Sequence, residues 1–416
     1  MQDNEKKPAL RFKGFTDPWE QRKLGDAFER VVRKNTNNES RLPLTISAQD
    51  GLVDQITYFN NRVASRDVSN YYLVYNGEFA YNKSTSDGYP FGAVKRLDWY
   101  EKGVLSTLYI VFALKHPEKD DSDFMTVFYD TDRWHRGVAE RAAEGARNHG
   151  LLNISADDFF DIDTTMPEDK VEQEKIGRLL KKLDTLITLH QRKYEKLVNI
   201  KKSMLDKMFP KNGASAPEIR FKGFTDLWEQ RKLEEYLEVS GQKNFEGIYT
   251  KEDVLSVSGD FGIVNQIEFQ GRSFAGASVA NYGVVETGDI VYTKSPLKSN
   301  PYGIIKANKG KNGIVSTLYA VYKPKQSANP EFVQIYFEQD ARMNNYMHPL
   351  VNKGAKNDMK VSAENALKGQ IVFPDIKEQR TISEFFHNLD TLITLHQRKL
   401  EKLQNIKKSC LEKMFV

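Results

Sequence analysis

Two long stretches of the chain place their seam residues in alternating steps of four and three. The first begins at Ile176 and the second at Ile382. This spacing is typical of a helix that packs along a second helix. Each stretch spans roughly 33 residues, which would extend about 50 Å as a helix. The positions that follow along the two seams are Leu180, Leu183, Ile187, His190, Tyr194, Leu197, Lys201, Met204 and Met208, then Phe386, Leu389, Ile393, His396, Leu400, Leu403, Lys407, Cys410 and Met414.

Prolines mark the limits of these two predicted helices. Pro167 and Pro374 lie just upstream, where a helix can begin, and Pro210 ends the first helix. Because both helices carry the same seam, we expect them to pack on each other, antiparallel if the two halves are related by a two-fold axis. His190 and His396 fall on the seam, so we interpret them as packing or interhelical hydrogen-bonding residues rather than metal ligands.

The remaining segments predict mixed α/β domains. Several short stretches combine β-branched and aromatic residues and are separated by Gly, Asn and Asp, which is typical of strands between turns. Two longer stretches have spaced apolar residues without an internal proline, so we expect helices at 123–145 and 330–346. The expected strands are 71–75, 78–81 and 104–114 in the first half, and 282–285, 289–292 and 314–322 in the second.

The two halves of the chain repeat each other. RFKGFTDPWEQRKL at 11–24 returns as RFKGFTDLWEQRKL at 220–233, and LDTLITLHQRK occurs at both 183–193 and 389–399. A repeat of this length indicates two copies of one domain and one helix. Internal two-fold symmetry gives two equivalent faces, so we expect a partner that offers two sites.

Between these blocks the copies match mainly at glycines, prolines and apolar positions, which preserve a backbone. The stretches 77–95 and 288–306 align, as do Gly-Ala-Arg-Asn at 145–148 and Gly-Ala-Lys-Asn at 354–357. The residues that differ fall in the loops, where binding residues are usually displayed. We therefore expect one scaffold that presents two different recognition surfaces.

Composition is ordinary for a protein that folds in water. Of the 416 residues, 39% are hydrophobic and 28% charged, and the net charge of +4 does not by itself indicate nucleic-acid binding. The one cysteine, Cys410, matches Met204 in the other copy, so we expect a buried packing residue in a reducing, cytoplasmic setting. The polar N-terminus and the lack of long apolar runs favour a protein that is neither secreted nor membrane-spanning.

Motifs for catalysis are not evident in the sequence. The stretch 310–313 lacks the glycine spacing and hydroxyl residue of a phosphate-binding loop. Ser299-Asn300-Pro301-Tyr302 approaches the Asn-Pro-Pro-Tyr motif of amino-methyltransferases, but it has one proline, and the matching stretch 88–91 has no amide before its proline. We interpret 299–302 as a turn. No histidine pair has metal-ligand spacing, so we expect no metal and no cofactor.

The repeated motifs resemble the specificity (S) subunit of type I restriction-modification enzymes. The resemblance is carried by the Phe-Lys-Gly-Phe-Thr-Asp opening, the Ser-Thr-Leu-Tyr stretch, the Gly-Ala-Arg/Lys loop, the Glu-Gln-x-x-Ile helix start and the Leu-Asp-x-Leu-Ile-x-x-His-Gln-Arg-Lys helix. These motifs occur in the same order in both copies and cover essentially the whole chain.

The resemblance implies a noncatalytic subunit with two mixed α/β target-recognition domains joined by two long antiparallel helices. Each domain would read one half of a bipartite double-stranded DNA site, while the helices set the gap and dock two methyltransferase (M) subunits. Restriction (R) subunits would complete an ATP-dependent endonuclease and adenine-N6 methyltransferase. The implied segments are domain 1 (1–165), helix 1 (166–209), a linker (210–219), domain 2 (220–373) and helix 2 (374–416).

Candidate DNA contacts lie in loops that match in position and differ in content. Lys, Arg, Asn and Ser side chains there can bind phosphates or base edges, and the Gly-Ala before Arg147 and Lys356 allows a close approach of the backbone. A solvated turn residue is the alternative for each lysine. The candidates are Asn82, Lys83, Ser84, Lys95, Arg96, Arg147 and Asn148 in the first copy, and Lys294, Ser295, Lys298, Lys306, Lys311, Lys356 and Asn357 in the second.

Other repeated residues are expected to hold partners or the fold. Trp19 and Trp228 are too similarly placed to discriminate two half-sites, so we expect them to cap each domain or meet the helices. Two alternative functions stay open: a free-standing methyltransferase or nuclease, and a scaffold or coiled-coil interaction protein without DNA specificity. For the helices, the alternative to a spacer is that they dimerise two chains. The expected docking residues for the M subunits are Gln191, Arg192, Gln397 and Arg398.

Overall fold

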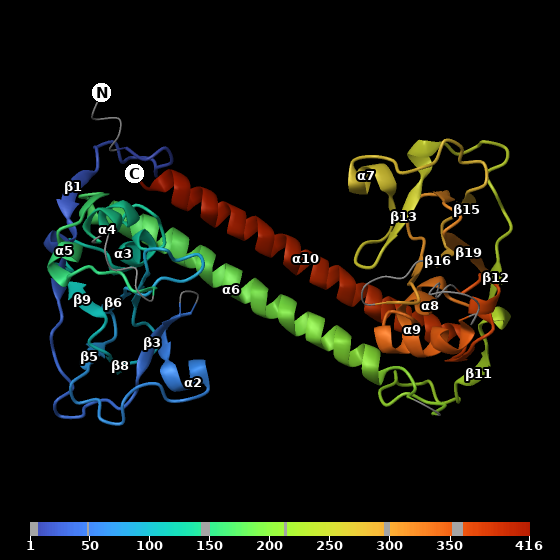
Figure 1. Ribbon diagram of the computed structural model, residues 1–416, viewed down its shortest axis with the longest axis horizontal. Coiled ribbons are helices and arrows are strands. Elements are labelled where there is room, and N and C mark those ends of the chain that lie inside the picture. Colours follow the sequence, from blue (N-terminus) through green and yellow to red (C-terminus); the bar gives the residue numbers. More distant parts are fainter. Residues whose placement is uncertain (1–6, 48–49, 143–149, 212–213, 295–299, 352–360) are drawn as a thin grey trace. The chain divides into compact units, whose positions relative to one another are not determined.

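The computed structural model describes residues 7–47, 50–142, 150–211, 214–294, 300–351 and 361–416. These form two compact units (Figure 1). Unit 1 comprises residues 1–191 and 398–416, and unit 2 comprises residues 192–397. Both units combine short strands with helices, which confirms the predicted mixed α/β class.

The described part of unit 1 folds its strands into small antiparallel sheets. A central sheet has the order β2-β9-β6-β7, and three strand pairs, β1-β10, β3-β4 and β5-β8, surround it. The elements that precede the long helix are β1 (Glu20–Lys23), α1 (Leu24–Ala27), β2 (Phe28–Arg30), β3 (Leu44–Ser47), β4 (Gly51–Asp54), α2 (Gln55–Phe59), β5 (Tyr72–Tyr75), β6 (Phe79–Asn82), β7 (Ala93–Arg96), β8 (Lys102–Leu105), β9 (Ile110–Leu114), α3 (Ser122–Phe128), α4 (His135–Arg141), α5 (Ala156–Phe160) and β10 (Asp163–Met166).

Unit 2 repeats this topology. Its central sheet has the order β12-β19-β16-β17, with the pairs β11-β20, β13-β14 and β15-β18 around it. The elements are β11 (Glu229–Lys232), η3 (Leu233–Glu235), β12 (Leu237–Val239), η4 (Lys251–Asp253), β13 (Leu255–Ser258), β14 (Gly262–Asn265), α7 (Gln266–Gln270), β15 (Gly283–Val285), β16 (Ile290–Thr293), β17 (Ile305–Ala307), β18 (Gly313–Val315), β19 (Tyr319–Pro324), α8 (Pro330–Tyr336), α9 (Asp340–Met347), η5 (His348–Leu350), η6 (Asn365–Leu367) and β20 (Gln370–Phe373).

Alternation along the central strands buries both faces of the sheet in unit 1. In the β6–β9 pair, Phe79 lies opposite Phe112 and Ala80 lies opposite Val111. The two phenylalanines join the main core, whereas Ala80 and Val111 join a second cluster with residues of β3, β5 and β8. Successive side chains of a strand point to opposite faces, so the sheet separates the helix-covered core from a second layer of strands.

The predicted continuous strands 104–114 and 314–322 were wrong, because each is two strands separated by a turn. The hydroxyl of Ser106 accepts a hydrogen bond from the amide of Leu108 at 3.2 Å, and its carbonyl accepts one from the amide of Tyr109 at 3.2 Å. Ser316 makes the same turn in unit 2, with Leu318 exposed at its tip. The Ser-Thr-Leu-Tyr motif is therefore a serine-directed turn between strands of two different sheets.

The predicted single helices 123–145 and 330–346 are also each divided into two. In unit 1, the hydroxyl of Thr131 donates to the carbonyl of Phe128 at 2.6 Å, which occupies an acceptor that a continuing helix would use. The chain then turns and α4 begins at His135. In unit 2, α8 ends at Tyr336 and α9 begins at Asp340.

Both long helices are present, as the seam predicted. Helix α6 spans Lys170–Lys207 and helix α10 spans Ile376–Met414. The start of α6 and the end of α10 belong to unit 1, where Leu183 of α6 and Leu403 of α10 pack in one core. The end of α6 and the start of α10 belong to unit 2. Within each unit the two helix segments therefore run antiparallel.

Each core is closed by the end of a helix that begins in the other unit. In unit 1, Phe415 lies 5.5 Å from Phe124 and 6.1 Å from Trp19 between ring centroids, and Cys410 and Met414 join the same core. Figure 1 shows the C-terminal end of α10 at this part of unit 1. The structure confirms that Cys410 is a buried free cysteine.

Unit 2 is closed in the same way by the end of α6. Phe209 lies 6.0 Å from Trp228 and 5.7 Å from Phe332 between ring centroids, and Met208 is buried beside it. The structure thus confirms that Trp19 and Trp228 meet the helices: both indoles are almost completely buried.

The repeated opening is tied to the start of each long helix. Arg11 donates two hydrogen bonds to the buried carboxylate of Glu172, at 2.6 and 2.8 Å, and Arg220 does the same to Glu378 at 2.7 Å each. Such bidentate, charge-assisted pairs are geometrically specific. This contact explains why the arginine and the glutamate recur in both copies.

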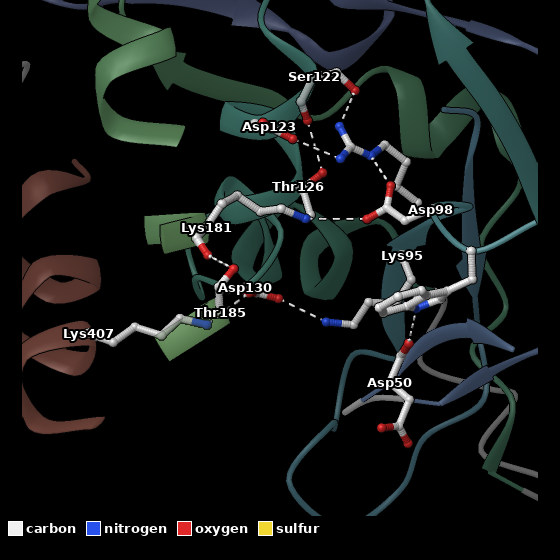
Figure 2. Close-up of polar contacts among 12 residues, drawn as sticks. Asp50, Lys95, Asp98, Ser122, Asp123, Thr126, Asp130, Lys181, Thr185 and Lys407 are labelled. Carbon is white, nitrogen blue, oxygen red and sulfur yellow. Dashed lines mark hydrogen bonds and ion pairs between the residues drawn. The ribbon is translucent and has the colours of Figure 1, made fainter. Parts of the chain in front are cut away.

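Polar seam residues anchor α10 in unit 1. The ammonium of Lys407 lies 3.3 Å from Asp130 and 2.6 Å from Asp184, and the ammonium of Lys95 lies 2.9 Å from Asp130. Figure 2 shows Lys95 and Lys407 approaching Asp130 from two sides. Burial raises the pKa of Asp130, but the two lysines outweigh it and hold that pKa below its usual range.

Unit 2 contains the matching arrangement on α6. The ammonium of Lys201 lies 2.6 Å from Glu338 and 2.7 Å from Asp390. The lysine at this seam position is partly buried in both units, and it forms ion pairs that link one long helix to the other and to the adjacent domain.

The first prediction concerns the closure of unit 1. We expect Phe415→Ala to lower the free energy of unfolding of unit 1 by about 3–5 kcal/mol, because the side chain fills an aromatic core. Hydrogen–deuterium exchange should show reduced protection in α3 of unit 1 and unchanged protection in α8 of unit 2. The matched control, Phe261→Ala, removes a phenylalanine that is 68% exposed and should change stability by less than about 0.5 kcal/mol. An equal decrease in protection in both units would contradict the prediction that Phe415 stabilises unit 1 alone.

The second prediction concerns Lys407. We expect Lys407→Met to destabilise unit 1 by about 1–3 kcal/mol near neutral pH, because it leaves two carboxylates with less compensation. Lys408→Met, which changes an exposed neighbour, is the control. Because the folded-state pKa of Asp130 is lowered, its ion pairs stabilise fully above the unfolded pKa of about 4 and are lost as the pH falls through the folded value.

Urea unfolding of both variants at several pH values tests this. The difference in free energy of unfolding between wild type and Lys407→Met should shrink as the pH falls from about 7 to about 3. A constant difference would show that Lys407 stabilises by packing of its methylenes and not by charge.

Candidate nucleic-acid interface

The first group of candidate DNA contacts follows β6 and lies against residues 150–154. The amide of Ser84 donates to the side-chain oxygen of Asn82 at 3.0 Å, and the amide of Leu152 donates to the carbonyl of Lys83 at 2.9 Å. The ammonium of Lys83 donates to the carbonyl of Ile154 at 3.3 Å. These contacts fix the backbone after β6, so Asn82 and Ser84 have defined positions at the end of that strand.

A glycine shapes this loop in each unit. Gly92 has a φ of +75°, and a Cβ there would lie 2.1 Å from the carbonyl oxygen of Asn82. Gly303 has a φ of +83°, and its Cβ would lie 1.8 Å from the carbonyl oxygen of Thr293. Only glycine fits so close a return of the loop onto the strand. The amide of Gly303 also donates to the carbonyl of Asn300 at 2.9 Å, as expected for a turn.

Lys95 and Arg96 lie on β7 and are held inside unit 1. Besides the contact of Lys95 with Asp130, the guanidinium of Arg96 lies 2.6 Å from Asp98 and 2.8 Å from Asp123. The side chains of Lys95 and Arg96 are 17% and 12% exposed, so they offer little surface to a ligand. Lys95 and Arg96 therefore belong to an ion-pair network. Arg96 links β7 to Asp123 of α3, and Lys95 links β7 through Asp130 to Lys407 of α10. Figure 2 shows Lys95, Asp130 and Lys407 in this network.

The matching residue of unit 2 is similarly enclosed. Lys306 is 7% exposed, and burial lowers its pKa, with Glu338 and Lys201 nearby. Lys309 and Lys311 are both exposed, and the ammonium of Lys309 lies 3.2 Å from Glu331. The predicted contact of Lys311 with DNA stays a prediction. Lys294, directly after β16, is partly buried, and its amide donates to the carbonyl of Leu318 at 3.2 Å.

Several candidates lie outside the described residues. These are the Gly-Ala loop residues and the residues after Lys294, namely Arg147, Asn148, Ser295, Lys298, Lys356 and Asn357. Their proposed contacts with DNA stay predictions.

The sequence analysis missed a pair of buried asparagines. Asn35 is fully buried and donates to the carbonyls of Ser40 and Val68, at 2.8 and 3.4 Å, thereby joining two loops of unit 1. Asn244 joins Tyr249 and Val279 in unit 2 with the same two distances. Lys-Asn at 34–35 and 243–244 follows the repeated opening at the same spacing in both copies, which is the signal that would have found the pair.

The two loops joined by the buried asparagine form a frame that is repeated in both units, but this frame carries different side chains in each unit. In unit 1 the joined loops enclose a hollow of about 330 Å³ that is rich in arginine and contains Asn38, Arg41, Arg62, Arg66, Asp67 and Val68. In unit 2 the loop after Asn244 carries exposed Phe245 and Ile248, and the second loop carries exposed Phe274. A repeated backbone frame with unlike side chains agrees with the expectation of one scaffold and two recognition surfaces.

The predicted docking residues lie at the middle of the long helices. Gln191 and Arg192 are in α6, and Gln397 and Arg398 are in α10. Arg192 lines a shallow depression of about 480 Å³ along α6, together with Lys196 and Asn199. Contacts with a partner stay a prediction, as does the seam role of Ile187, His190, Tyr194, Ile393, His396 and Leu400.

No cluster of three His, Cys, Asp or Glu residues in the described part of the chain is arranged to hold a metal ion. No helix in the described ranges combines the length and apolar character that a membrane crossing requires.

Known structures share this fold. No model of a known protein family matches the chain. The S subunit of the type I restriction-modification system from M. genitalium is 14% identical, the match covers 99% of this chain and 99% of that chain, and the TM-score is 0.57.

Two further structures are less similar. The HsdS subunit from Thermoanaerobacter tengcongensis is 15% identical over 95% of this chain and 96% of that chain, with a TM-score of 0.42. A structure that concerns complex assembly and conformational transition of the type I R-M system is 16% identical over 95% and 97%, also with a TM-score of 0.42. On the strength of the first match, this chain has the fold of a type I restriction-modification S subunit.

Proposed function

We propose that the chain is the DNA-recognition specificity subunit of a type I restriction-modification complex and acts in the cytoplasm. The observation that carries the proposal is the repeated frame: two units share one strand topology and one buried asparagine, yet display unlike loops. A chain with the S-subunit fold and two such units is suited to read a DNA site with two different halves.

The proposal assigns a role to each segment. Residues 1–165 and 220–373 are the two target-recognition domains, and each reads one half-site. Residues 166–209 and 374–416 are the helices that set the gap between the half-sites. The faces around Gln191, Arg192, Gln397 and Arg398 dock two M subunits, and R subunits join the complete complex, so the chemistry resides in the partners.

Readout within each domain is proposed for the loops beyond the central sheet. The described candidates are Asn82, Lys83 and Ser84 of unit 1 and Lys294 and Lys311 of unit 2, because they lie near strand ends and are at least partly exposed. Asn and Ser side chains can read base edges, while Lys and Arg side chains position the duplex through its phosphates. Lys95 and Arg96 are left out of the proposed contacts because they are paired inside unit 1, and Lys306 is left out because it is buried.

The third prediction is a domain exchange. The full chain is reconstituted with its M subunit, and methylated adenines are mapped on genomic DNA. Replacing residues 40–144 with the matching segment of another S subunit should change one half of a bipartite motif and leave the other half unchanged. The matched control replaces residues 251–351 and should change the opposite half.

Other outcomes would point to the alternatives. A motif whose two halves change together would contradict the assignment of one half-site to one unit. Methylation by the chain without the M subunit would favour a free-standing enzyme. Partner binding without any methylated motif would favour a scaffold protein.

A further inference from the structure

The hollow in unit 1 has a fixed frame. The side-chain oxygen of Asn35 accepts a hydrogen bond from the amide of Ser40 at 3.1 Å, while its amide group donates to the carbonyls of Ser40 and Val68. The loops 35–41 and 62–68 are thus held together by one buried side chain. A site on these loops is preorganised, which lowers the entropic cost of binding.

Positive charge in this hollow exceeds negative charge. Three arginines and one aspartate line it. Arg62 is held in place because its guanidinium donates to the carbonyls of Ala64 and Ser65, at 3.3 and 3.0 Å. Among the residues that the structure describes, no hydrogen bond or ion pair is made by the side chains of Arg41 and Arg66.

The aspartate does not neutralise these arginines. A carboxylate oxygen of Asp67 accepts a hydrogen bond from the amide of Ser69 at 2.9 Å, which turns it toward its own loop. The hollow therefore presents guanidinium groups whose donors are available. A guanidinium presents its N–H donors in a planar fork that matches the oxygens of a phosphate.

Unit 2 has the same asparagine-joined loops without arginines at the positions of Arg41 and Arg66. Ser40 and Tyr249 make the same hydrogen bond to the buried asparagine, so Thr250 occupies the position of Arg41. Val68 and Val279 also match in this way, so Ala277 occupies the position of Arg66. Exposed Phe245, Ile248 and Phe274 lie on these loops instead. The arginines are thus not required by the shared frame, which favours a role in binding.

We propose that the hollow formed by Arg41, Arg62 and Arg66 binds a phosphate of the DNA backbone next to the half-site read by unit 1. This inference rests on the proposed function and adds an asymmetry to it: unit 1 holds the duplex through a fixed phosphate anchor that unit 2 lacks. Phosphate contacts set register and orientation on the duplex without carrying sequence information.

The fourth prediction tests this anchor with R41Q/R66Q, which removes two charges and leaves Asn35 and Arg62 in place. The full chain with its M subunit is titrated with a cognate duplex over a range of salt concentrations. Affinity at physiological salt should fall roughly tenfold, and the slope of log K against log salt should become shallower by about 1 for each phosphate that the variant no longer binds. The methylated motif should stay the same.

Two further variants are matched controls. R136Q removes an arginine on α4 that is 88% exposed and pairs only with the neighbouring Glu140 in the described part of unit 1, so affinity and salt slope should not change. R41K/R66K keeps the charges and should restore most of the salt slope. Hydrogen–deuterium exchange of β5 and β8 should be the same in all variants, which excludes unfolding of unit 1 as the cause.

The outcomes separate the inference from the proposed function. If the wild type methylates one bipartite motif while R41Q/R66Q keeps its affinity and salt slope, the phosphate anchor is wrong and the proposed function stands. If no motif exists, the proposed function fails and the anchor fails with it. Calorimetry with inorganic phosphate alone distinguishes a second source of the same chemistry: saturable binding that R41Q/R66Q abolishes, with no change in the DNA salt slope, would overturn the assignment to DNA.

Discussion

Burial of the end of a long helix in the core of each unit is the constraint on which the rest of the structure depends. Phe415 completes the aromatic core around Trp19, and Phe209 completes the one around Trp228. The core of unit 1 is assembled from two separate stretches, 1–191 and 398–416, whereas unit 2 is the single stretch 192–397. The partly buried lysines Lys407 and Lys201 form ion pairs near these helix ends, so each helix is held both by apolar burial and by ion pairs.

The parts of the fold that depend on periodicity and repetition could be predicted from the sequence. The four-three spacing indicated both long helices, and the match of Cys410 with Met204 indicated a buried packing residue. The errors arose where a polar side chain redirects the backbone. Ser106 ends a run that otherwise has the composition of one strand, and Thr131 ends a helix whose apolar spacing continues. Local hydrogen bonds of this kind depend on tertiary context and do not alter the apolar pattern.

The candidate site also could be predicted only in part from the sequence. Sequence could identify loops that match in position and differ in content, but it could not distinguish a solvated lysine from a buried one. Lys95 and Lys306 match in the alignment, and both are enclosed in their units: Lys95 pairs with Asp130, and Lys306 is buried. Arg41 and Arg66 were overlooked because they have no counterpart in the other copy. In a duplicated chain, matched polar residues tend to serve the shared scaffold, and unmatched ones are better candidates for recognition.

The discontinuous core of unit 1 also affects how the protein is made. Trp19 leaves the ribosome early, whereas Phe415 is synthesised about 400 residues later, which takes roughly 20–80 seconds at common translation rates. During that time the pocket around Trp19 and Phe124 lacks its last apolar neighbour. The entropic cost of closing a loop rises only slowly with its length. The delay before Phe415 is synthesised therefore hinders folding of unit 1 more than the cost of loop closure does. A nascent chain of this design passes through a long stage with exposed aromatic surface, in which binding by a chaperone would protect it from aggregation.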